Sequence, residues 1–156
     1  MKNWTKLTVA VLVCELVGIF STPFTLSAIP TWYTTLVKPF FSPPNWLFGP
    51  IWTVLYFLMG VALYFIWKQG WSKKKIKMAG TFFLIQLVLN FLCPVFFFGL
   101  RSPLLGFIDI LLLLILIVIT MRQFYAISKL SFYLLIPYVV WVSFATVLNG
   151  AILVLN

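Results

Sequence analysis

The sequence predicts an all-α integral membrane protein, built as a bundle of five transmembrane helices. Hydrophobic residues make up 63% of the 156 positions and charged residues only 8%, far from the roughly half and one quarter typical of soluble domains. Backbone amides in lipid must be bonded internally, so only helices or a closed barrel span a bilayer. The apolar runs are continuous rather than alternating with a period of two, which favours helices.

Five apolar runs form the predicted helices of a single domain over residues 1–156, and they lie at 7–26, 46–67, 78–100, 104–121 and 132–155. Each is about 18 to 24 residues long, and roughly 20 residues cross a hydrocarbon core. The first run follows Lys2 and Lys6, as a signal peptide would. It is too long for the apolar part of a signal peptide and is followed by a poor cleavage site, so we expect a retained helix.

The connection between the first two runs, residues 27–45, is long, aromatic and rich in proline. Pro39, Pro43 and Pro44 fix φ and remove backbone donors, so the loop is stiff. A stiff aromatic loop at the mouth of a helix bundle indicates the lid of an apolar ligand site. In the second run, one helical face carries Trp52, Tyr56, Met59 and Gly60.

Polar residues inside the later runs are costly in lipid and therefore informative. Gln86 and Asn90 of the third run are four residues apart and share a helix face. They either hydrogen-bond neighbouring helices, or Asn90 is a polar anchor inside an apolar cavity. Glu15 of the first run and Asp109 of the fourth run are open to the same two readings.

The fifth run carries Trp141, Ala145, Leu148 and Asn149 on one face, where the small Ala145 leaves room beside the indole. A rise of about 1.5 Å per residue places these residues in the same half of the bundle as Trp52, Asn90 and the long loop. Trp52 and Trp141 lie too deep for an interfacial belt of tryptophans. The sequence therefore predicts a mostly apolar pocket below the loop.

The basic residues predict the orientation of the chain. All lysines and arginines except Lys38 and Arg101 fall in the N-terminal segment and in the second and fourth connections. The positive-inside rule then places the N-terminus in the cytoplasm, with the first loop and the C-terminus outside, in what we expect to be a bacterial cell membrane. The net charge of +9 thus reflects topology, and we expect no nucleic-acid partner.

Two further features bear on partners. The basic run at residues 73–77 either recruits anionic membrane lipid or only fixes the orientation. Cys14 and Cys93 lie inside predicted spans, and the chain has no histidine, so we expect no metal site and no hydrolytic or metal-dependent catalysis. The small residues Gly18, Ser21, Thr22 and Gly80 permit close helix approach and are candidates for a dimer contact.

Three separated motifs give the chain a family resemblance over residues 18–156. They are WYTTLVKPFFSPPNWLFGPIWTVLYFLMG at 32–60, QLVLN at 86–90 with PVFFFGLR at 94–101, and IPYVVWVSFATVLN at 136–149. In this order on a five-helix pattern, they resemble the TspO/translocator protein family of tryptophan-rich sensory and peripheral benzodiazepine receptor proteins.

The resemblance implies a five-helix bundle, often a homodimer, with one ligand cavity per subunit beneath the first loop. Family members bind porphyrins such as protoporphyrin IX and haem, and synthetic isoquinoline carboxamides and benzodiazepines, without a required cofactor. The residues that match or should line this cavity are Tyr33, Phe48, Trp52, Asn90, Trp141, Ala145, Leu148 and Asn149. The resemblance thus implies a membrane receptor or sensor for tetrapyrroles.

Two other functions stay open at this stage. Some bacterial relatives promote light-dependent breakdown of bound protoporphyrin, for which Trp52 and Trp141 would be the redox partners. A transporter of porphyrin-like apolar cargo is the third possibility, weakened by the odd number of helices. The chain also departs from the family pattern. Phe91 and Cys93 stand where tryptophans are usual, and Gly150 replaces a tyrosine of the sterol motif in the animal proteins.

Overall fold

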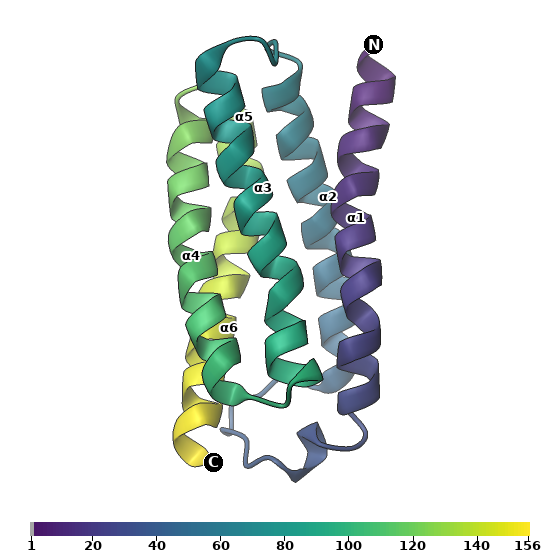
Figure 1. Ribbon diagram of the computed structural model, residues 1–156, viewed down its shortest axis with the longest axis vertical. Coiled ribbons are helices and arrows are strands. Elements are labelled where there is room, and N and C mark those ends of the chain that lie inside the picture. Colours follow the sequence, from purple (N-terminus) through teal and green to yellow (C-terminus); the bar gives the residue numbers. More distant parts are fainter. Residues whose placement is uncertain (1) are drawn as a thin grey trace.

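The computed structural model describes residues 2–156 as five helical spans, each long and apolar enough to cross a bilayer. The predicted five-helix membrane fold is confirmed (Figure 1). The elements are α1 Asn3–Ala28, η1 Tyr33–Thr35, η2 Asn45–Leu47, α2 Phe48–Trp67, α3 Lys74–Pro94, the π-helical turn η3 Val95–Gly99, α4 Pro103–Tyr125, α5 Lys129–Leu134 and α6 Ile136–Leu155.

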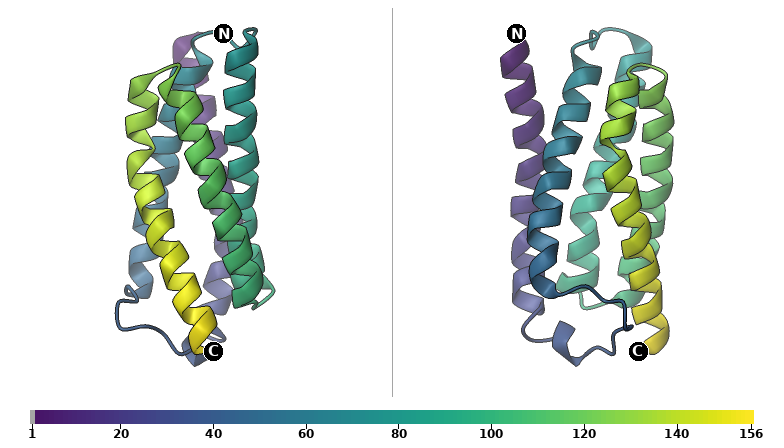
Figure 2. Two further views of the ribbon diagram at one scale, coloured as in Figure 1. Left: turned by 90° about the vertical axis from the view of Figure 1, so that its left-hand side faces the viewer. Right: turned by 180° about the vertical axis from the view of Figure 1, so that it is seen from behind.

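The helices form a closed ring, in which α1 packs against α2 and α3, α3 against α4, α4 against α6, and α5 against α2. The N-terminus, the α2–α3 connection and the α4–α5 connection lie at one end, which we call the basic end (Figure 1). The long first loop and the C-terminus lie at the opposite end, which we call the loop end (Figure 2). Only Lys38 and Arg101 bring basic side chains to the loop end.

The predicted fifth helix is divided into two parts. Helix α5 ends at Leu134, and α6 begins at Ile136 with Pro137 in its first turn. Proline has no N–H to donate to the carbonyl four residues earlier, and its ring disfavours the preceding helical turn. The hydrogen bond from Leu135 N to Phe132 O, at 3.1 Å, therefore replaces the regular pattern at the junction.

The junction sets the direction of α6 relative to α2. Helix α2 packs extensively against α5 near the basic end and much less against α6. The two helices therefore diverge toward the loop end, as seen from behind in Figure 2. This divergence positions the cavity described below.

A second irregularity ends α3. Pro94 provides no N–H for the carbonyl of Asn90, and the chain continues as the turn Val95–Gly99, closed by a bond from Leu100 N to Val95 O at 2.8 Å. Widened turns of this kind occur often at functional sites. Here the turn directs Phe97 and Phe98 toward Tyr33 of the first loop.

Two glycines bring α1 and α2 close together near the middle of the bundle. A Cβ atom at Gly60 would lie 2.5 Å from the Cα of Val11, and one at Gly18 would lie 2.6 Å from the Tyr56 ring. Gly80 is likewise covered by the ring of Trp71. Gly18 and Gly80, considered above for a dimer contact, thus pack inside a single chain.

Candidate ligand cavity

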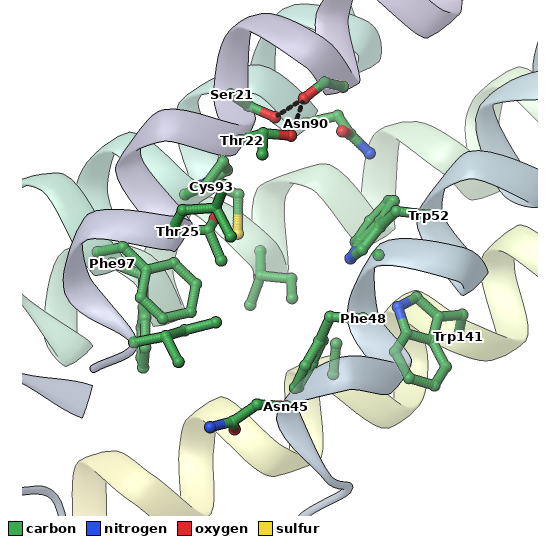
Figure 3. A pocket seen from close by; sticks show the side chains of 18 of the residues that line it. Ser21, Thr22, Thr25, Asn45, Phe48, Trp52, Asn90, Cys93, Phe97 and Trp141 are labelled. Atoms are coloured by element: carbon green, nitrogen blue, oxygen red, sulfur yellow. Dashed lines mark hydrogen bonds between the residues drawn. The ribbon is translucent and has the colours of Figure 1, made fainter. Parts of the chain in front are cut away.

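A cavity of about 440 Å³ lies in the loop-end half of the bundle. Its walls come from α1, α2, the end of α3 with η3, and α6 (Figure 3). Small-molecule sites are mostly apolar hollows of roughly 300–1,000 Å³ with a few polar groups. The hollow exists because α2 and α6 diverge below the Pro137 junction.

All eight residues expected from the sequence line this one cavity. Tyr33 comes from the loop, Phe48 and Trp52 from α2, Asn90 from α3, and Trp141, Ala145, Leu148 and Asn149 from α6. Four segments far apart in the sequence are thus brought together at one place. Whether these residues contact a ligand stays a prediction.

The wall formed by α2 and α6 is aromatic. Phe48 meets Trp141 edge-on, with ring centroids 6.0 Å apart at 71°. The ring centroid of Trp52 lies 5.5 Å from that of Tyr56 and 6.4 Å from that of Tyr138. Figure 3 shows the indole rings of Trp52 and Trp141 on the same side of the cavity, from neighbouring helices. Offset and edge-on surfaces of this kind suit a flat, apolar ring system.

A chain of four polar side chains begins at the deep end of the cavity, which Tyr56 and Asn90 line. Tyr56 donates to Asn90 Oδ1, Asn90 Nδ2 donates to Tyr138 Oη at 2.8 Å, and Tyr138 donates to Gln86 Oε1 at 2.7 Å. All four side chains are buried. Asn90 therefore has both roles left open by the sequence, since it links helices and lines the cavity. An amide has two N–H donors and two lone pairs, so half of its capacity is used here.

Helix α1 forms a further wall of the cavity, which was not predicted from the sequence. Ser21, Thr22 and Thr25 line the cavity, and so does Glu15, which lies earlier on the same helix. Ser21 Oγ and Thr22 Oγ1 both donate to the carbonyl of Gly18, at 3.0 and 2.7 Å (Figure 3). The recurrence of small residues at 18, 21, 22 and 25 on one helix face was the available signal, because such side chains leave space.

The two residues that depart from the family pattern have different positions. Cys93 lines the cavity, where its thiol occupies far less space than an indole would. Phe91 instead packs edge-on against Phe24 of α1, at 6.5 Å between ring centroids. The first departure therefore enlarges the cavity, and the second changes the contact between α1 and α3.

The first loop covers the cavity at the loop end and is fixed there by aromatic contacts. The Tyr33 ring lies 6.3 Å from Phe97 and 5.5 Å from Phe98, and Phe41 lies 6.3 Å from Phe144 of α6. Lys38 Nζ lies 4.3 Å from the Tyr33 ring centroid. Burial raises the pKa of the Tyr33 phenol above its usual value of 10.0, against the opposing effect of a hydrogen bond with Ser42. The first loop therefore covers the cavity, as expected, and its role as the lid of a ligand site stays a prediction.

The side of the cavity between α1 and α2 is open toward the lipid-facing surface. The lining residues Ile19 and Leu26 of α1 are 60% and 64% exposed, and Gly49 and Thr53 of α2 are also exposed. The backbones of the two helices touch at Gly60, nearer the basic end, so the opening begins beyond that contact. Within residues 2–156, no group of three or more His, Cys, Asp or Glu side chains is placed to hold a metal ion.

Comparison with known proteins gives consistent matches over most of the chain. The family model described as "TspO/MBR family" matches residues 10–155. The chain is 47% identical to the tryptophan-rich protein TspO of Archaeoglobus fulgidus over 155 residues, covering 99% of both chains. It is 38% identical to the human translocator protein over 120 residues, covering 76% of this chain and 70% of the relative. It is 31% identical to the tryptophan-rich sensory protein of Cereibacter sphaeroides over 125 residues, covering 80% and 77%.

Proposed function

The chain belongs to the TspO/MBR family of membrane proteins, and we propose that it is a receptor or sensor that binds a tetrapyrrole in the cavity beneath the first loop. Protoporphyrin IX and haem are the proposed ligands, and isoquinoline carboxamides and benzodiazepines are proposed to occupy the same space. The names of two relatives, translocator protein and tryptophan-rich sensory protein, agree with a role in sensing or translocation.

The observation that carries the proposal is the composition of the cavity wall. Trp52, Phe48 and Trp141 present aromatic surfaces from two helices, while Ala145 leaves the space between them free. A flat macrocycle buries a large apolar area against such surfaces, and each buried Å² contributes about 25 cal/mol. Asn90 keeps half of its hydrogen-bonding capacity for a polar substituent of the ligand.

We propose that such a ligand enters through the open side of the cavity. Tetrapyrroles partition into bilayers, and Ile19, Leu26 and Thr53 border an opening at the lipid-facing surface. We propose that binding uses no covalent chemistry, no further cofactor and no metal ligand from the protein. We further propose that the chain resides in a cell membrane with its basic end in the cytoplasm, and that it forms a homodimer.

The test is quenching of tryptophan fluorescence when protoporphyrin IX is titrated into the detergent-solubilised protein. We expect saturable quenching with a micromolar or tighter dissociation constant, weakened at least severalfold by Trp52→Phe, Asn90→Ala and Trp141→Phe. Trp4→Phe is the matched control, because Trp4 is 81% exposed near the N-terminus, far from the cavity. Linear quenching that ignores all four changes would mean partition into micelles and would refute the proposal.

Light-driven breakdown of bound protoporphyrin is a second candidate function. It is favoured by a row of oxidisable rings that begins at the cavity. The ring centroid of Trp52 lies 5.5 Å from that of Tyr56 and 6.4 Å from that of Tyr138. We expect illumination of the complex in air to bleach the porphyrin, and Trp52→Phe to slow the bleaching more than it weakens binding. Bleaching at the parent rate in Trp52→Phe would exclude this role of the indole.

A further inference from the structure

A second hollow lies in the opposite half of the bundle, toward the basic end. It is a groove of about 220 Å³, with Val9 and Val13 of α1 on one side and Leu84 of α3 on the other. Leu63 and Trp67 of α2 also line it, together with Trp71 of the α2–α3 connection. Figure 1 shows α2 behind the space between α1 and α3 in this half. The three wall residues are 37%, 38% and 45% exposed, so the groove opens on the lipid-facing surface.

The end of the groove nearest the basic end is formed by Trp71. Its ring covers Gly80 of α3, where no side chain would fit, and lies 6.2 Å from the Trp67 ring at 65°. Tryptophan side chains concentrate at the level of the lipid headgroups. This pair therefore marks the depth at which the groove passes from the acyl-chain region to the headgroup region.

Two lysines flank that end of the groove, one on each wall. Lys6 lies one turn before Val9 and two turns before Val13, and Lys77 lies two turns before Leu84. Residues spaced by three, four or seven share a helix face, and α1 and α3 both begin at the basic end. Lys6 and Lys77 are therefore continuous with the apolar walls, at headgroup depth.

Three of the other basic side chains at this end make contacts within the chain. Lys75 Nζ donates to the carbonyl of Ala126 at 3.1 Å, and Lys68 Nζ lies 4.7 Å from the Phe65 ring centroid. Lys129 Nζ lies 5.9 Å from the Tyr125 ring centroid. Among the described residues, no such contact holds Lys6 or Lys77, so both ammonium groups are available to an anion. The same is true of Lys2, Lys73, Lys74 and Arg122, and Lys6 and Lys77 are distinguished by their register with the groove walls.

We propose that this groove binds an anionic phospholipid. One acyl chain lies along Val9, Val13 and Leu84, and the phosphate lies between Lys6 and Lys77. Toward the basic end, the apolar groove is followed by the tryptophan pair and then by the two ammonium groups. This order matches the acyl chain, the boundary region and the charged headgroup of a phospholipid. Basic pockets between transmembrane helices favour anionic headgroups, at about 1 kcal/mol per lysine or arginine. This site lies in the half of the bundle opposite the ligand cavity and does not depend on the proposed function.

The test uses the full-length protein in bilayers that contain phospholipid brominated on its acyl chains, which quenches tryptophan on contact. Brominated phosphatidylglycerol is compared with brominated phosphatidylcholine as the probe. We expect the anionic lipid to quench at a severalfold lower mole fraction, and Trp71→Phe to remove most of this difference. Lys6→Gln with Lys77→Gln should remove most of this severalfold preference, because both ammonium groups that attract the phosphate are then absent.

The matched control is Arg122→Gln with Lys129→Gln, which removes the same charge from the same end of the bundle but away from the groove. We expect this pair to keep the preference of the parent. Equal quenching by the two lipids would overturn the proposal. An equal loss in the control pair, or a preference unaffected by Trp71→Phe, would also overturn it, because the attraction would then be to the surface as a whole.

Discussion

The side-chain amide of Asn156 forms two hydrogen bonds with the backbone of Val37. Its Oδ1 accepts from the Val37 N–H and its Nδ2 donates to the Val37 carbonyl, each at 2.9 Å. The same Nδ2 donates to Ile152 O at 2.8 Å, which fixes the amide on the last turn of α6. The middle of the first loop is thereby attached to the helix that carries Trp141 and Ala145. The cover of the cavity and its aromatic wall are one connected unit.

Asn156→Ala should loosen this attachment without unfolding the bundle. Two neutral hydrogen bonds contribute about 1 kcal/mol each, so the loop should open roughly 30-fold more often. Hydrogen exchange of the Val37 amide measures this opening. Val37→Ala keeps the peptide group and should retain the protection, so a loss of equal size in both variants would contradict the role assigned to Asn156.

Tyr33 should make the loop sensitive to alkaline pH. Its pKa is raised in the closed loop, mainly by burial, while an open loop would ionise near 10.0, the usual value. The open form thus loses a proton first as the pH rises above 10, and the closed form is destabilised there. The difference in phenolate absorbance between the parent and Tyr33→Phe reports the titration of Tyr33. In Asn156→Ala, the pKa of Tyr33 should move toward 10, because the loop is open more often. A titration at 10 in the parent would refute the buried position.

Tyr138→Phe should separate the structural role of the polar chain from its role in binding. The change removes the donor to Gln86 and the acceptor for Asn90, leaving two buried amide groups less satisfied at a cost of about 1–3 kcal/mol. Tyr138 does not line the cavity. Thermal unfolding in detergent should show the loss of stability, whereas the affinity for protoporphyrin should change far less than in Trp141→Phe. An unchanged unfolding temperature would contradict the hydrogen-bonded chain.

Gly60→Ala should destabilise the contact between α1 and α2. The new Cβ would meet the backbone of Val11 at 2.5 Å and that of Ala10 at 3.0 Å, and backbone atoms move less readily than side chains, so we expect a loss of about 1–3 kcal/mol. Gly49→Ala on the same helix is the control, because nothing lies within 4 Å of its Cβ position. Equal unfolding temperatures for both variants would show that α1 and α2 are not in close contact.

The helical spans follow from composition, but their irregularities do not. A continuous apolar run from 132 to 155 hides the break at Leu135, since Pro137 acts on the turn before it and leaves the hydropathy unchanged. The turn at 95–99 has the same origin in Pro94. Proline marks both positions in the sequence, yet the resulting direction of the helix depends on packing against α2 and α5.

The candidate site was partly predictable for a similar reason. Large aromatic and amide side chains such as Trp52 and Asn90 are unusual in a span and attract notice. The wall from α1 consists of Ser21, Thr22 and Thr25, whose importance lies in the space that they leave. The role of Tyr138, one of the two partners of Asn90, was not predictable, because a tyrosine near a predicted helix end is common and its hydrogen bonds depend on the direction of α6.

The most direct test of the account is to fill the cavity from inside. Ala145 lines it between Trp141 and Leu148, whereas Val147 on the same helix is 62% exposed at the lipid-facing surface. Equilibrium titration with protoporphyrin IX, followed by porphyrin absorbance, should show at least a tenfold weaker affinity for Ala145→Phe and parent affinity for Val147→Phe. If Ala145→Phe folds and binds porphyrin as tightly as the parent, the ligand lies elsewhere and the central claim is wrong.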